Sequence, residues 1–73
     1  MTKGIAIKHS RVRVAYGLYQ SERGEMPRGD GRWMFRAVGS ETRFICSGLY
    51  SKAKRSAMRK AASRGVYDIE VMP

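Results

Sequence analysis

The side chains that could carry out chemistry are few in this chain of 73 residues. There is one histidine, His9, and one cysteine, Cys46, and nothing in the sequence brings them together. Metal sites need several cysteines, histidines or carboxylates at set spacings, and the sequence has no such group. Asp68 and Glu70 share one face of a predicted strand, where pairing with arginines of neighbouring strands is a commoner role than acid–base catalysis. We therefore expect neither an enzyme nor a metal or cofactor site.

Basic side chains are the abundant functional groups. Lysine and arginine number 15 against 6 acids, which gives a formal net charge of +9. Such a charge is typical of proteins that bind nucleic acid or a nucleoprotein complex, and less often of proteins that bind an anionic membrane. No apolar run reaches the ~20 residues of a membrane span, no secretory signal is evident, and a lone cysteine is consistent with a reducing cytosol. We expect a cytoplasmic monomer that binds an anionic partner and no membrane.

The densest group of cations lies in a predicted helix over residues 51–64. Ser51 is a suitable N-cap, and Gly65 suits the left-handed position that follows a helix. Four apolar side chains share one face and should pack on a sheet: Ala53, Ala57, Ala61 and Met58. The sheet must supply bulkier side chains, because alanines bury little area.

The opposite face of this helix carries basic side chains and no acid: Lys52, Arg55, Arg59 and Lys60. Like charges four residues apart, such as Arg55 and Arg59, cost roughly 0.2–0.5 kcal/mol per pair. A lysine in the first turn is also unfavourable for the helix dipole. We therefore predict that these four side chains bind nucleic acid or an acidic protein surface.

A second basic cluster lies near the N-terminus. Residues 5–8 predict a short edge strand or an ordered arm, and residues 11–16 predict a strand in which valines alternate with arginines. A strand that is both apolar and basic, near an end of the chain, suits edge pairing with a protein partner. We predict a protein-docking surface made of six side chains: Ile5, Ile7, Lys8, Arg11, Arg13 and Tyr16.

The remaining segments complete one small domain. Residues 20–31 predict a long loop, which together with an arm over residues 1–10 is expected to be mobile. Residues 32–37 and 42–46 predict a hairpin, and residues 67–71 a last strand. Four hairpin side chains should face the helix: Trp33, Phe35, Phe44 and Cys46. The sequence predicts a single α+β domain over residues 1–73, with a small antiparallel sheet of three to four strands, one helix packed across it, and a tail in the order strand–strand–helix–strand.

The length, the strong basicity, the opening residues MTKGIAIK and this tail together resemble the small transcription regulator of a lytic Xanthomonas phage. The resemblance implies a protein that binds host bacterial RNA polymerase at the start of the β′ subunit and at the β flap, near the RNA exit channel. It also implies inhibition of transcription initiation by displacement of the σ factor, and antitermination. The site of action would then be the host cytoplasm.

The residues also leave open a direct DNA- or RNA-binding module. It would use the basic helix, or arginines that alternate along the hairpin at positions 32, 36 and 43. Three tyrosines, at positions 16, 19 and 50, would either stack on unpaired bases or cover the rim of the core. Salt dependence separates this alternative from a protein–protein contact, because phosphate binding by several cations weakens steeply with salt.

Overall fold

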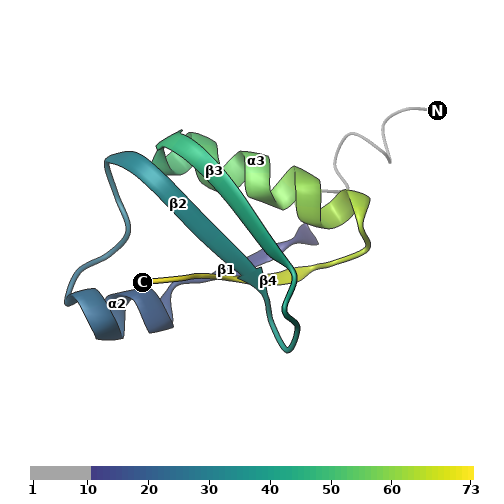
Figure 1. The fold of residues 1–73 in the computed structure, drawn as a ribbon, viewed down its shortest axis with the longest axis horizontal. Coiled ribbons are helices and arrows are strands. Elements are labelled where there is room, and N and C mark those ends of the chain that lie inside the picture. Colours follow the sequence, from purple (N-terminus) through teal and green to yellow (C-terminus); the bar gives the residue numbers. More distant parts are fainter. Residues whose placement is uncertain (1–10) are drawn as a thin grey trace.

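The computed structural model describes residues 11–73. Predictions for residues 1–10, including the edge strand or arm, lie outside the described part. The fold is α+β, as predicted, with the following elements in chain order: β1 (Arg13–Ala15), α2 (Gly17–Arg23), β2 (Asp30–Ala37), β3 (Arg43–Leu49), α3 (Tyr50–Ser63) and β4 (Asp68–Val71) (Figure 1). Neither described helix is long and apolar enough to cross a membrane.

The four strands form one sheet in the order β1-β4-β2-β3. β2 pairs antiparallel with β3, with Trp33 opposite Cys46, and also antiparallel with β4. β1 pairs with β4 in the parallel direction, so the sheet is mixed and not wholly antiparallel as expected. The alternating sequence patterns identify each strand, but they do not specify which strands become neighbours when these are far apart in the chain.

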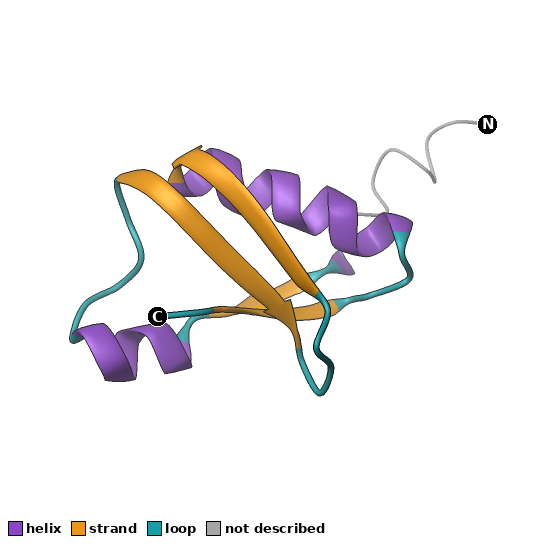
Figure 2. Ribbon diagram, in the orientation of Figure 1, coloured by secondary structure: helices purple, strands orange, loops and turns teal. Residues whose placement is uncertain are grey.

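The core lies between α3 and one face of the sheet (Figure 2). Ala53, Ala57 and Ala61 are almost fully buried, and their small side chains let the helix approach the strands closely. The sheet supplies the bulk, as predicted, and its four expected hairpin side chains are all buried: Trp33, Phe35, Phe44 and Cys46. Burying a side chain such as Phe35 contributes roughly 1.5–3 kcal/mol.

The two ends of α3 differ in how well the sequence predicted them. The helix begins at Tyr50 with Leu49 as N-cap, so Ser51 is not the cap. The backbone N–H of Tyr50 instead donates to the carbonyl oxygen of Gly29 at 2.8 Å. The ring of Tyr50 packs edge-on against Trp33, 5.0 Å between centroids, and this contact ties the first residue of the helix to the core. Gly65 follows the helix with φ 74°, as predicted.

The helix α2 was not predicted: the sequence pattern indicated a strand over residues 11–16 and a loop over residues 20–31. Seven residues are too few to show a helical period in the sequence. Two contacts with residues distant in the chain stabilise α2. The Tyr19 ring lies 5.7 Å from the Trp33 ring, and Arg23 Nη2 donates to the carbonyl oxygen of Pro73 at 3.2 Å. Only residues 24–29 connect α2 to β2 without regular structure.

Candidate functional site

The four predicted cations of α3 lie on its solvent side and define the basic face: Lys52, Arg55, Arg59 and Lys60, all exposed. The buried alanines place them there, because they fix which side of the helix meets the sheet. Lys52 and Arg59 are seven residues apart, which is about 10 Å along the axis at 1.5 Å per residue. Within residues 11–73 the one ion pair is Arg36–Glu70, so no described acid neutralises the basic face.

The helix dipole distinguishes two members of the basic face. Lys60 lies in the last turn of α3, where a cation is favourable. Lys52 lies in the first turn, which has no acidic side chain, and a cation there is unfavourable. The helix dipole therefore explains a cation at Lys60 and does not explain one at Lys52.

Other arginines have clear structural partners. Arg36 donates from Nε and Nη2 to Glu70 Oε2, at 3.0 and 2.6 Å. The guanidinium of Arg64 lies 5.7 Å from the centre of the Phe44 ring, and that of Arg23 lies 5.6 Å from the Tyr19 ring. These cation–π contacts stabilise the fold. The pairing of Glu70 with an arginine of a neighbouring strand is the role predicted for it.

The structure describes three of the six residues predicted for docking. Arg11 and Arg13 are exposed and line an open depression of about 450 Å³ together with Tyr67 and Asp68; we refer to these four residues as the β1 surface. Tyr16 follows β1 and does not line this depression. The other three, Ile5, Ile7 and Lys8, lie outside the described residues.

β1 is an edge strand of the sheet, with backbone groups that point away from β4. Arg13 N–H donates to the carbonyl oxygen of Tyr67 at 2.8 Å, so the peptide groups of Arg13 face β4. Successive residues of a strand direct their peptide groups to opposite sides, and the N–H and C=O of Val14 therefore point away from β4. No other described strand pairs with this edge. A partner strand could add here by β-augmentation.

Two of the three tyrosines considered for base stacking cover the core rim. Tyr19 and Tyr50 are half-buried and both contact Trp33, and burial raises the pKa of Tyr50 above its ordinary value, with a smaller effect from Tyr16. Tyr16 is 40 % exposed and is the most accessible of the three.

The sheet face opposite α3 carries the three alternating arginines at positions 32, 36 and 43. It also carries three apolar side chains that the sequence analysis did not select: Met34, Ile45 and Met72. The two-residue period of the strands indicates that these side chains share a face. Met34 lies between Arg32 and Arg36 in this period, and Met72 continues the series of Asp68 and Glu70.

Residues 11–73 hold no cluster of three or more His, Cys, Asp or Glu side chains that could bind a metal. No protein-family model matches the chain, and no curated protein sequence or solved structure is significantly similar to it.

Proposed function

We propose that this protein is a non-enzymatic transcription regulator that binds bacterial RNA polymerase. The observation that carries the proposal is the basic face of α3, which has no acidic partner among the described residues and includes the unfavourable Lys52. Cations kept at a cost to helix stability favour an anionic partner outside the chain. The sequence resemblance supports polymerase as the machine that provides this partner.

The two basic surfaces would have separate tasks. The β1 surface and the open backbone edge of Val14 would contact the polymerase protein, at the start of β′ and at the β flap. The basic face of α3 would then lie against DNA or RNA near the exit channel. Occupying this position would displace the σ factor and promote read-through at terminators, in the cytoplasm of the bacterial host, and it requires no bond to be made or broken.

Co-purification with RNA polymerase tests the docking assignment. Arg13 is opposite Asp68 in the register of β1 and β4, so Arg13→Glu would place two acids side by side and weaken the sheet. The better variant combines Arg11→Glu with Arg13→Gln, and we expect it to lose polymerase in a pull-down that includes nuclease. Its control is Arg59→Glu, which reverses a charge on α3 and should retain polymerase once nuclease has removed the nucleic acid.

Retention of polymerase by the Arg11→Glu, Arg13→Gln variant, with an unchanged thermal melt, would remove the β1 surface from the proposal. If the unmodified chain does not capture polymerase at all, the proposed function fails as a whole.

Direct binding of nucleic acid is the second candidate. It is favoured by the length of the basic face, about 12 Å of helix from Lys52 to Lys60 with no acid, which is the usual electrostatic footprint of a phosphate-binding surface. A mobility-shift titration with bare DNA duplex at 50 and 200 mM salt separates the two candidates. Binding through the four cations of the basic face should weaken about 10²-fold across this range, and about 10³-fold if six or more cations contact phosphates. A protein contact with an apolar centre should weaken far less.

A further inference from the structure

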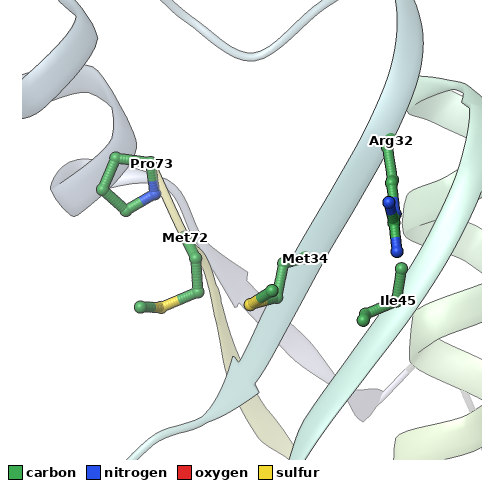
Figure 3. Close-up of a pocket in the computed structure, with 5 residues that line it drawn as sticks. All are labelled: Arg32, Met34, Ile45, Met72 and Pro73. Carbon is green, nitrogen blue, oxygen red and sulfur yellow. The ribbon is translucent and has the colours of Figure 1, made fainter.

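The sheet face opposite α3, which we call the open face, is not covered by any element within residues 11–73. Its outward side chains come from β2, β3 and the end of β4, and they surround a hollow of about 390 Å³ lined by Arg32, Met34, Ile45, Met72 and Pro73 (Figure 3). The side chain of Ile45 is 46 % exposed, although it is a large aliphatic residue in the middle of a strand. The open face therefore presents apolar area to solvent on a strongly basic chain.

The apolar side chains of the open face form a row that runs across β3, β2 and the segment that follows β4. Ile45 is directly opposite Met34 in the register of β2 and β3. Met72 is next to Met34 on the other side, because the Met72 N–H donates to the Met34 carbonyl oxygen at 2.8 Å. Neighbouring strands are about 4.8 Å apart, so the row is about 10 Å long. It runs perpendicular to the strands.

Cations flank this row on both sides. Arg32 lies on one side of the row, two residues before Met34 in β2. Arg36 and Arg43 lie on the other side, opposite each other in the register of β2 and β3. Glu70 neutralises Arg36 through two hydrogen bonds. Arg32 and Arg43 are exposed and have no described acidic partner. An apolar strip between two uncompensated arginines is complementary to a strip of apolar side chains between acids.

We infer that the open face binds an acidic amphipathic helix of a partner protein. Two helical turns rise about 10.8 Å, which matches the length of the row, and apolar side chains at every third or fourth position would contact Met72, Met34 and Ile45 in turn. Acidic side chains on the helix flanks would reach Arg32 and Arg43. The two methionines adapt to different apolar shapes, so the face selects a class of helix and not one sequence.

The charges and the apolar row exclude the other obvious occupants. A second copy of this chain would bring the arginines of two open faces against each other. Nucleic acid would leave the apolar row against phosphates or base edges. The inference does not rest on polymerase being the partner, because it uses neither the basic face of α3 nor the β1 surface.

Methyl NMR with a synthetic helix tests the inference directly. The probe is a peptide longer than about 15 residues, so that it is helical in water, with leucine at every third or fourth position and glutamate on the flanks. We expect it to shift the methyl resonances of Met34 and Met72 and to leave those of Met26 and Met58 unchanged. Two control peptides, with serine in place of leucine or lysine in place of glutamate, should not bind.

Four outcomes of this experiment would overturn the inference. The first is no binding at millimolar peptide, and the second is equal shifts at Met26, Met34, Met58 and Met72. The third is equal binding by either control peptide. The fourth is displacement of the peptide from Met34 and Met72 by bare DNA duplex or by vesicles of anionic phospholipid.

Matched variants locate the contact. Ile45→Glu should weaken peptide binding about tenfold or more, whereas Leu18→Glu, which introduces the same charge at an exposed aliphatic residue of α2, should not. If Ile45→Glu does not fold, Ile45→Thr keeps the β-branched shape of the strand residue and should also weaken binding. Arg43→Glu should weaken binding more than Arg59→Glu on α3. Equal effects of the two arginine changes would mean that net charge alone attracts the peptide, and the open face would be ruled out.

Discussion

At the scale of single residues, the basic side chains of this chain divide by what they touch. Arg36, Arg64 and Arg23 each have a partner within the fold, an acid or an aromatic ring. Lys52 and Arg59 have no described acidic partner and lie on solvent-facing helix positions. A cation without a partner contributes little to folding, so the candidates for binding are identified by the contacts they lack and not by their charge alone.

Tyr50 gives a prediction at this scale. Its raised pKa means that the folded chain holds the phenol proton more tightly than the unfolded chain does. The contribution of this group to the free energy of unfolding is constant below the ordinary pKa of 10.0 and is lost as the pH rises through the folded-state value. We expect Tyr50→Phe to reduce the loss of stability above pH 10, measured by denaturant unfolding at neutral and alkaline pH. An identical alkaline loss in both proteins would contradict this expectation.

At the scale of elements, the two ends of α3 are fixed in different ways: the C-terminal end by local backbone geometry, and the N-terminal end by a tertiary contact. The C-terminal end is local: Gly65 N–H donates to the Ala62 carbonyl oxygen at 3.0 Å, and Val66 N–H donates to that of Ala61 at 2.8 Å. This is the Schellman arrangement, which requires a left-handed residue. The N-terminal end depends on the ring of Tyr50 and its contact with Trp33, and therefore on the packed core.

Replacement of Gly65 tests the local end. A Cβ at this position would meet no atom within 4 Å, so any cost comes from the left-handed backbone. We expect Gly65→Ala to lower the free energy of unfolding by about 1 kcal/mol. Gly17→Ala is the matched control, because Gly17 also has free space around it and has no positive φ. It should raise stability by about 0.5 kcal/mol. Equal effects of the two changes in a urea titration would refute the backbone explanation.

At the scale of the whole molecule, the net charge of +9 is distributed over different surfaces. The basic face of α3 lies on one side of the sheet and the open face on the other, so one molecule could contact nucleic acid and an acidic protein at the same time. The β1 surface lies at the β1 edge of the sheet, outside both faces. This division suits a small regulator that joins components of a larger assembly.

Charge reversal at the two ends of α3 tests whether binding and stability are separate. Lys52→Glu should raise the free energy of unfolding by about 0.3–1 kcal/mol, because an acid is favourable in the first turn. Lys60→Glu should lower it by a similar amount, because Lys60 lies in the last turn. Both changes remove a cation from the basic face, and both should weaken binding to a complex of polymerase and DNA. The stability of each variant is measured by thermal melting on the same samples. If the more stable Lys52→Glu variant binds better and the less stable Lys60→Glu variant binds worse, the basic face has no direct role in binding.

The sequence by itself determined the features that depend on near neighbours in the chain. These are the apolar face of α3, the alternation of β2, β3 and β4, the glycine after the helix, and the placement of Lys52, Arg55 and Arg59 on the solvent side. Each follows from the 3.6- or 2-residue period of the backbone. They were sufficient for the fold class and for the basic face.

Only the tertiary structure decided the features that depend on contacts distant in the chain. β4 lies between β1 and β2 and makes the sheet mixed, and α2 forms where Tyr19 can pack on Trp33. The open face required the register as well, since Ile45 lies on β3, Met34 on β2 and Met72 directly after β4, and they become one row only when these strands pair. Periodicity indicates which way a side chain points, but the side chain beside it on the next strand is set by the fold as a whole.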